Sequence, residues 1–323
     1  MSCESERVLS VVVIGLNEQD RLKASLDAVF LNRPEGYELE VLYVDSGSTD
    51  RSVEIARSVP GVAVLHLEGG RPSAARARNL GLRQARGPYV QLIDGDSVVQ
   101  PGWMARALEF LEARPDASCA FGQIVEMHPE QSTYMKVCGL DWHIPPGERR
   151  FCGGNSMWRR SVIAANGFFD EGIQVGEEPE LCYRVRHAGG RIVCLDLPMV
   201  EHDLGMHTFG QYWGRSVSSG RAYASIAARF WRNPEKMWLR ETLVNFAEPA
   251  AWLVIFAAAW LVFGAAVAVV VILAWWLGRA LQIATTLRRR RVALATAVMY
   301  GLHCQFARFP AALGQLKALS GRR

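Results

Sequence analysis

The stretch Tyr89-Val90-Gln91-Leu92-Ile93-Asp94-Gly95-Asp96 decides which fold the sequence predicts. Its apolar first part follows Gly87-Pro88, which is typical of a buried strand bounded by turn residues. Open α/β sheets bind ligands beyond the carboxyl ends of their strands, so we expect Asp94 and Asp96 to lie at the mouth of a site. Carboxylate oxygens suit Mg²⁺ or Mn²⁺ together with substrate phosphates, which predicts a nucleotide-diphosphate site. The alternative is a solvated turn, because Asp-Gly-Asp is a short motif.

The chain before this stretch alternates strands with helices. Apolar residues recur at helical spacing from Leu22 to Phe30, and residues 73–84 form a second helical pattern rich in alanine and arginine. Strands separated by helices of about ten residues indicate right-handed βαβ crossovers and a parallel sheet, so the predicted fold class is α/β. The expected strands are residues 9–14, 40–44, 62–67 and 89–93.

From Pro101 onward the pattern is less regular. Residues 126–150 contain three prolines and no clear periodicity, which indicates a long loop of the kind that forms acceptor loops or lids. The remaining expected elements are helices at 103–111 and 176–188 and strands at 117–125 and 191–195.

Composition limits the possible functions. The 323 residues exceed one typical domain, and their net charge of +4 includes arginines that crowd toward the C-terminus. This charge pattern points to a membrane surface and not to nucleic acid. The seven cysteines are an odd number without a Cys-x-x-Cys motif, which is typical of reduced thiols in a cytosolic compartment. Residues 1–7 are polar and lack the apolar core of a signal peptide, so we expect the following domain to stay in the cytoplasm.

A long uncharged run indicates attachment to a membrane. Residues 249–278 contain no charged side chain, whereas one helix needs only about 20 apolar residues to cross a bilayer. Arginines follow the run, and short basic segments stay cytoplasmic. We therefore favour a helical hairpin that bends near Gly264 and extends toward Leu287. A single tilted span is the alternative. Residues 292–319 have the periodicity of an interfacial helix, or equally of a helix packed on the domain.

Five motifs together resemble inverting family 2 glycosyltransferases. The resemblance covers residues 8–224 and continues in the hydrophobic tail, which looks like that of bacterial membrane-attached members that make cell-surface polysaccharides. It implies the GT-A fold, in which a nucleotide-binding α/β sheet packs against an acceptor-binding half. The motifs, in order, are Val11 to Glu18, Val44-Asp45-Ser46-Gly47-Ser48-Thr49-Asp50, Ala77-Arg78-Asn79-Leu80-Gly81, Asp94-Gly95-Asp96 and Gly176-Glu177-Glu178-Pro179-Glu180-Leu181.

The resemblance assigns donor-binding roles by position. Asp45 would accept hydrogen bonds from the base, although an aspartate here can instead cap the following helix. Arg78 would reach the base or the diphosphate, for which a guanidinium is well shaped. Asp94 would contact the ribose or the metal ion, and Asp96 would bind the metal ion itself. The donor-binding residues implied in this way are Asn17, Glu18, Asp45, Arg78, Asn79 and Asp94.

A third acid is needed for transfer with inversion, because a base must take the proton of the acceptor hydroxyl. Glu178 occupies the position that the family uses. The family commonly has Glu-Asp where this chain has Glu177-Glu178, so Glu177 stays a second candidate. The alternative is that both acids only complement the dipole of the helix that they begin.

The remaining candidates depend on the resemblance or on residue type. His202 follows the last expected strand and would bind the metal ion or lie near the diphosphate, unless it is structural. The sequence Gln211-Tyr212-Trp213-Gly214-Arg215 departs from the Gln-x-x-Arg-Trp of processive synthases, which favours the addition of one sugar at a time. Glycine allows close approach of the backbone to a ligand, and tryptophan can stack on a sugar or lie in the core. The candidate acceptor-binding residues are Gly153, Gly154, Asn155 and Trp158.

The sequence thus predicts a membrane-attached, metal-dependent inverting glycosyltransferase that uses a nucleotide-diphospho-sugar and a lipid-linked or glycan acceptor at the cytoplasmic face. A sugar-phosphate nucleotidyltransferase and a catalytically inactive nucleotide-binding scaffold are the alternatives. The expected organisation is a tail (1–7), a GT-A domain (8–230, with halves 8–100 and 101–230), a linker (231–248), a membrane segment (249–287) and a basic, interfacial end (288–323).

Overall fold

The computed structural model describes residues 7–288 and 290–320. They form two compact units. The N-terminal unit contains the chain up to Met127 together with Trp142–Asp203, and the helical unit contains His128–Asp141 together with the chain from Leu204 onward. The boundary therefore lies at residue 203 and not near the expected residue 230, because the helix that follows belongs with the C-terminal helices.

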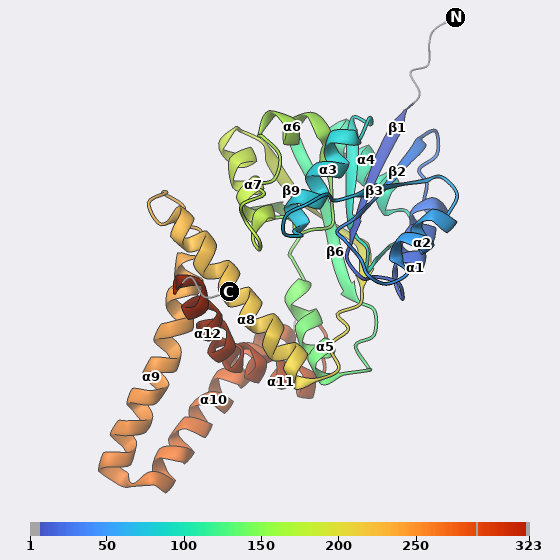
Figure 1. Ribbon diagram of the computed structural model, residues 1–323. Coiled ribbons are helices and arrows are strands. Elements are labelled where there is room, and N and C mark those ends of the chain that lie inside the picture. The colour runs from blue at the N-terminus through green and yellow to red at the C-terminus, as the bar shows by residue number, and fades with distance from the viewer. Residues whose placement is uncertain (1–6, 289, 321–323) are drawn as a thin grey trace, which may run out of the picture. The chain divides into compact units, whose positions relative to one another are not determined.

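The N-terminal unit is a sheet with helices along its connections (Figure 1). Its strands are β1 (Val8–Gly15), β2 (Glu38–Asp45), β3 (Val62–His66), β4 (Tyr89–Asp94), β5 (Ser97–Val99), β6 (Ala117–Glu126), β7 (Gly147–Arg149), β8 (Ser156–Arg159) and β9 (Arg191–His202). Its helices are α1 (Leu22–Leu31), α2 (Ser52–Ser58), α3 (Ala74–Gln84), α4 (Trp103–Ala113), α6 (Arg160–Ala165) and α7 (Glu177–His187).

The direction in which successive strands are added to the sheet changes beside the two predicted acids. The order is β3-β2-β1-β4-β8-β6-β9-β5, and β7 pairs with β9. The neighbours β3, β2, β1 and β4 are parallel, which confirms the crossovers expected for the first half. The chain builds the sheet in one direction from β1 to β3 and then returns to the other side of β1 with β4. This is a topological switch point, where open α/β sheets bind ligands.

The second half differs from an all-parallel sheet. β8 runs antiparallel to both β4 and β6, so the complete sheet is mixed. The expected long loop at 126–150 is wrong, because this region contains α5 (Thr133–Cys138), a 3₁₀ turn (Gly139–Trp142) and β7. The strand expected at 191–195 continues to His202. β7 and α5 have six residues or fewer, and no apolar run or clear periodicity marks them in the sequence.

Burial explains the composition of the central strands. In β1 every residue from Leu9 to Gly15 is buried, as expected for a parallel strand that is covered on both faces. One polar side chain in this core is satisfied, because Gln91 accepts a hydrogen bond of 2.9 Å from the indole of Trp103. The core therefore fixes the carboxyl ends of β1 and β4 next to each other, with Ile14 paired to Asp94.

The helical unit contains the predicted hairpin. Its long helices are α8 (Phe209–Phe230), α9 (Leu239–Phe263), α10 (Ala265–Arg288), α11 (Leu294–Phe306) and α12 (Arg308–Leu319). α9 and α10 run side by side and are separated by Gly264, whose φ of +84° suits glycine (Figure 1). Both helices are long and apolar enough to cross a membrane. Apolar side chains near the bend are exposed, and Leu261 reaches 88% exposure. The expected linker 231–248 is helical from Leu239.

Residues 292–319 form two helices and not one. α12 packs against α8 so closely that a Cβ atom on Gly220 or Gly314 would overlap the backbone of the other helix. α11 packs against α10, where Gly301 contacts the backbone of Ala280. These contacts favour the packed-helix alternative for this segment, because glycine is needed for such close approach.

Candidate active site

A cavity of 360 Å³ lies at the carboxyl ends of β1 and β4. Four of the predicted residues line it, namely Glu18, Arg78, Asp94 and Asp96. The cavity therefore coincides with the topological switch point of the sheet. The remaining lining residues are Ile14, Gly15, Leu16, Ser46, Pro72, Ser73, Ala74 and Gly95.

Arg78 connects two acids in the interior of the site. One guanidinium nitrogen lies 2.7 Å from Asp94 Oδ1, and another lies 2.7 Å from Glu177 Oε1. The residue is only 4% exposed. Burial alone would lower the pKa of Arg78, but the two carboxylates hold it above its usual value. Arg78 is thus a fixed positive charge that positions Asp94 at the cavity and Glu177 at the start of α7.

Asp96 and His202 form a second polar pair. His202 Nε2 lies 3.2 Å from Asp96 Oδ2, because β5 pairs with the end of β9 and brings Ser97 opposite His202. Burial would raise the pKa of Asp96, but the hydrogen bond and charge of His202 hold it below its usual value. The ring of Trp142 contacts the His202 imidazole edge-on, with centroids 4.9 Å apart. The sequence analysis names both residues as candidate metal ligands, and that role stays a prediction.

The Asp96–His202 pair has the donor atoms and spacing of a divalent-cation site. Neighbouring ligands at about 2.1 Å from an octahedral ion lie about 3 Å apart, close to the 3.2 Å between Asp96 Oδ2 and His202 Nε2. Imidazole with carboxylate suits Mn²⁺, and Asp94 adds a second carboxylate at the same cavity. The residues present therefore fit a divalent ion. Two other groups of possible ligands contain cysteine and are therefore softer sets than this one. They are Cys138 with Asp141 and His303, and Cys152 with Glu178 and Cys182.

Among the acids that line the cavity, Glu18 has the pKa that is shifted furthest from its usual value. Burial raises the pKa of Glu18 to about 7, although Arg21 lies 2.7 Å from its Oε2 and acts in the opposite direction. The charge of Asp96 also raises this pKa. Glu18 is therefore poised to change its ionisation near neutral pH when a cation or a ligand enters the cavity.

Two predicted donor-binding residues organise the loops beside the cavity. Asn17 Oδ1 accepts a hydrogen bond of 2.8 Å from the Thr49 amide, and the backbone of Asn17 adopts a positive φ of 60°. Asp45 Oδ2 accepts hydrogen bonds from the amides of Gly47 and Ser48, each 3.0 Å long. Asp45 therefore shapes the turn after β2 and does not cap α2. Both side chains are in loops at the correct end of the sheet, but neither lines the cavity.

Asn79 does not reach the cavity. Its side-chain Nδ2 donates a hydrogen bond to the Phe169 carbonyl, and its Oδ1 accepts one from the Phe169 amide, each 2.9 Å long. Its Nδ2 atom also donates to Glu171. Asn79 thus holds the segment before α7 in place, whereas the side chain of its neighbour Arg78 lines the cavity.

Glu178 lies in a pocket of thiols. Its Oε1 atom accepts a hydrogen bond of 2.7 Å from the Cys152 amide and lies 2.9 Å from Cys182 Sγ. Burial raises the pKa of Glu178 well above its usual value. Glu177 and Glu178 both begin α7, but only Glu177 contacts an arginine of the cavity wall. The two candidate bases therefore differ sharply in environment.

The segment 153–155 packs against Arg78 and Asp94 of the site. A Cβ atom on Gly154 would lie 2.6 Å from an Arg78 nitrogen and 2.7 Å from Asp94 Oδ2, so only glycine fits there. Asn155 is buried and accepts a hydrogen bond of 2.9 Å from the Asp94 amide. Trp158 is fully buried and donates to Ser156, which makes it a core residue and not a sugar platform.

Sequence reasoning missed the contribution of Pro72-Ser73-Ala74. These residues line the cavity at the start of α3, where Ser73 accepts a hydrogen bond from the Arg76 amide and caps the helix. A capped helix N-terminus pointing at a cavity favours phosphate. The proline and serine directly before an arginine-rich helix were the signal that could have identified this feature.

Comparison with known proteins agrees with this architecture. Residues 10–164 match the family model of glycosyl transferase family 2. The hyaluronan synthase of Pasteurella multocida is 25% identical over 236 residues, covering 60% of this chain and 24% of that protein. A pre-mycofactocin glycosyltransferase of Mycobacterium tuberculosis is 26% identical over 212 residues, covering 61% of this chain and 44% of that protein. The chain thus spans less than half the length of these curated relatives.

A solved structure extends the likeness to the whole chain. The mannosyltransferase PcManGT from Pyrobaculum calidifontis, in complex with GDP-Man and Mn²⁺, superposes with a TM-score of 0.68. It is 19% identical and covers 98% of this chain and 88% of its own. At this identity the likeness concerns the fold. The family match over residues 10–164 and these relatives make this part of the chain similar to glycosyl transferase family 2, and the solved structure shows that the chain has the GT-A fold.

Proposed function

We propose that the chain transfers a sugar from a nucleotide-diphospho-sugar to a hydroxyl group of a lipid-linked or glycan acceptor, with inversion at the anomeric carbon. The observation that carries this proposal is the cavity at the switch point, which combines Asp94, Asp96, Arg78 and a capped helix N-terminus. These groups suit a donor that carries both a ribose and a diphosphate.

A divalent ion completes the donor site in this proposal. Asp96 and His202 would hold the ion, with Asp94 beside them, and both Mg²⁺ and Mn²⁺ are compatible with carboxylate ligands. The bound ion supplies neutralisation of the charge that develops on the leaving diphosphate. Arg78 keeps Asp94 oriented, and the start of α3 offers amide groups to the phosphates.

Glu178 is the better candidate for the base. Glu177 is held in an ion pair with Arg78, so its carboxylate is already engaged. Burial raises the pKa of Glu178, which strengthens it once it is ionised. In the transfer step the acceptor oxygen bonds to the anomeric carbon, the bond from that carbon to the diphosphate oxygen breaks, and Glu178 takes the hydroxyl proton.

We further propose that the α9–α10 hairpin attaches the protein to the cytoplasmic membrane with the N-terminal unit on the cytoplasmic side. The exposed apolar residues of both arms and the arginines after α10 support this arrangement. Attachment of this kind would keep the enzyme beside lipid-linked or growing surface glycans, as in bacterial polysaccharide synthesis.

The test measures release of nucleoside diphosphate by the full chain in detergent with Mn²⁺ or Mg²⁺ and a panel of UDP-, GDP- and TDP-sugars. Asp96→Ala should abolish turnover and metal-dependent nucleotide binding. Asp116→Ala, which alters an exposed acid outside the cavity, is the matched control and should change neither. Glu178→Gln should retain nucleotide binding and lose about 100-fold or more in turnover.

Other outcomes contradict specific parts of the proposal. Full turnover by Glu178→Gln would remove the base assignment. Nucleotide binding without turnover on any donor would favour an inactive scaffold. Release of pyrophosphate from a nucleoside triphosphate and a sugar phosphate would favour a nucleotidyltransferase.

A further inference from the structure

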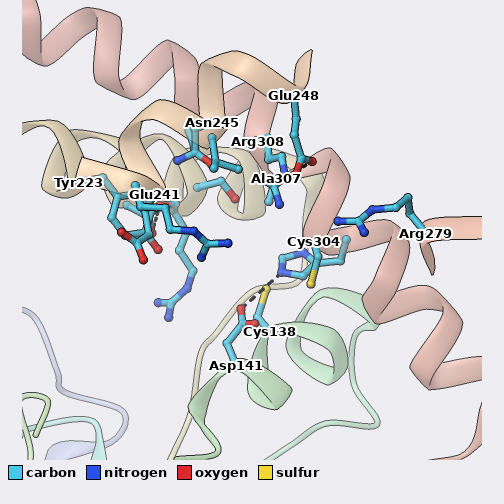
Figure 2. Close-up of a pocket in the computed structure, with 17 residues that line it drawn as sticks. Cys138, Asp141, Tyr223, Glu241, Asn245, Glu248, Arg279, Cys304, Ala307 and Arg308 are labelled. Atoms are coloured by element: carbon cyan, nitrogen blue, oxygen red, sulfur yellow. Dashed lines mark hydrogen bonds and ion pairs between the residues drawn. The ribbon is translucent and has the colours of Figure 1, made fainter. Parts of the chain in front are cut away.

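A second cavity lies within the helical unit and has no role in the proposed transfer. Its volume is 390 Å³, within the range of roughly 300–1,000 Å³ that small-molecule sites occupy. Helices α8 to α12 and the end of α5 contribute side chains to it. Figure 2 shows Asn245 and Glu248 on one side of the cavity, Asp141 and Cys138 on the other, and Arg279 extending toward Cys304.

The cavity lies where both arms of the hairpin become polar. The α9 residues that line it are Arg240 to Glu248, directly before the uncharged run that begins at Pro249. The α10 residue that lines it is Arg279, directly after that run ends at Gly278. If the uncharged arms enter the bilayer, the cavity is held at the level of the lipid head groups.

Positive charge exceeds negative charge in the cavity wall. The arginines are Arg215, Arg240, Arg279 and Arg308, and the acids are Asp141, Glu241 and Glu248. Two acids have partners already, because Glu248 lies 3.0 Å from Arg308 and Asp141 accepts a hydrogen bond of 2.7 Å from Tyr300.

Several donors in this wall have no acceptor. Among residues 7–288 and 290–320, Arg215 and Arg240 form neither an ion pair nor a side-chain hydrogen bond. Asn245 is only 8% exposed, and its Nδ2 atom has no hydrogen-bond partner in the part of the chain that the structure describes. A buried donor without an acceptor costs about 1–3 kcal/mol, so Asn245 calls for a ligand, whereas Arg215 and Arg240 are exposed and free to bind the same ligand.

A cation is a poorer fit to the same cavity. Cys138, Asp141 and His303 lie close enough together to share an ion. However, His303 Nε2 lies 3.4 Å from Asp141 Oδ2, and His303 Nδ1 lies 2.9 Å from the Tyr212 hydroxyl, so both ring nitrogens are already engaged. The open groups are arginines and an amide N–H, which are donors for an anion.

We propose that this cavity binds the phosphate or diphosphate head group of a membrane lipid, with Arg215, Arg240 and Asn245 as donors. Guanidinium groups bind phosphate with paired hydrogen bonds, and basic pockets between membrane helices on the cytoplasmic side hold anionic head groups. The inference rests on the membrane attachment proposed above, and it adds a lipid site separate from the donor cavity.

The test measures the thermal stability of the detergent-purified full chain without any sugar donor. Dioctanoyl phosphatidic acid should raise the melting temperature, dioctanoylglycerol should not, and inorganic phosphate or pyrophosphate should act only at much higher concentration. Arg215→Gln with Arg240→Gln should weaken phosphatidic acid binding by about tenfold or more. The control pair Arg290→Gln with Arg291→Gln removes the same charge from exposed arginines and should leave binding within about twofold.

Asn245→Leu separates binding from folding. Because the Asn245 Nδ2 atom has no partner, this variant should be as stable as the wild type without lipid, yet should lose most of the stabilisation by phosphatidic acid. Equal binding by dioctanoylglycerol, equal affinity for inorganic phosphate, or equal losses in the two arginine pairs would each overturn the proposal. Asp96→Ala should keep the lipid response, so failure of the transfer function and failure of this site are distinguishable.

Discussion

Arg78 is the residue on which the donor cavity depends. Its guanidinium is buried between Asp94 and Glu177. Arg78→Ala would leave two acids without their partner, and we expect it to reduce the free energy of unfolding by about 3–5 kcal/mol. Urea unfolding measures this change. The control is Arg83→Ala on the same helix, whose exposed pair with Glu171 should contribute about 0–1 kcal/mol. Equal effects of the two changes would show that Arg78 is not a structural centre.

Glu18 should make stability depend on pH. Burial raises its pKa from 4.5 to about 7 in the folded protein, so the folded state holds a proton that the unfolded state has lost. The free energy of unfolding should therefore fall as pH rises from 4.5 to 7. Glu18→Gln should remove much of this fall in urea unfolding series without added metal ions. Glu54→Gln changes an exposed acid whose pKa Arg51 lowers, and the fall should persist in that variant.

Sequence predicted which residue types gather at the site but not where each side chain points. The order of motifs placed Asp94, Asp96 and Glu18 correctly at the cavity, because strand ends in a parallel sheet meet at one edge. Asn79 lies on a predicted helix, and Trp158 lies on a strand that the sequence did not predict. Both side chains face away from the cavity, toward Phe169 and the core respectively. A shift of one position along a helix or strand changes the face to which a side chain points. The sequence pattern does not resolve that shift.

At the scale of elements, the break at Gly264 separates the two arms of the hairpin that the proposed membrane attachment requires. Its φ of +84° and ψ of 167° lie in a region that only glycine populates readily. Gly264→Leu should strain the reversal by about 1–3 kcal/mol and favour one continuous helix. A topology reporter fused after the last residue should then move to the far side of the membrane in a fraction of molecules.

Gly278→Leu is the matched control for this change. Gly278 lies on α10 of the same hairpin, and an added side chain there meets open space. The reporter should stay on the side of the N-terminal unit in this variant, as in the wild type. A reporter on the far side in the wild type itself would contradict the hairpin and restore the single tilted span.

Elements with a clear apolar run of their own were predictable, and short elements without one were not. The four parallel strands follow from apolar runs of five or more residues, and the hairpin follows from the long uncharged run. β5, β7, α5 and α6 have three to six residues each, and their pairing is set by the tertiary contacts of the second half. The antiparallel insertion of β8 beside β4 also lies outside any local pattern.

At the scale of the whole molecule, the helical unit is discontinuous in sequence. The segment His128–Asp141 belongs to it, and Met135 and Cys138 are buried there against Tyr212 and its neighbours. A chain that ends at Asp203 would expose this apolar surface, so we expect it to aggregate in size-exclusion chromatography.

Replacing residues 128–141 of that shortened chain with a glycine and serine linker is the control. This variant should be monomeric and should still bind nucleotide with a divalent ion, because the cavity residues all belong to the N-terminal unit. A simple truncation at Asp203 that stays soluble and monomeric would contradict the role given to α5.

The chain passes between the units three times, after Met127, Asp141 and Asp203. A protease that cuts the peptide bond after Asp203 would therefore not release the N-terminal unit. The severed N-terminal piece still carries α5, which stays packed among the helices of the helical unit through Met135 and its contacts. Release would need two further cuts, one at each end of the segment His128–Asp141, or extraction of α5 from the helical unit.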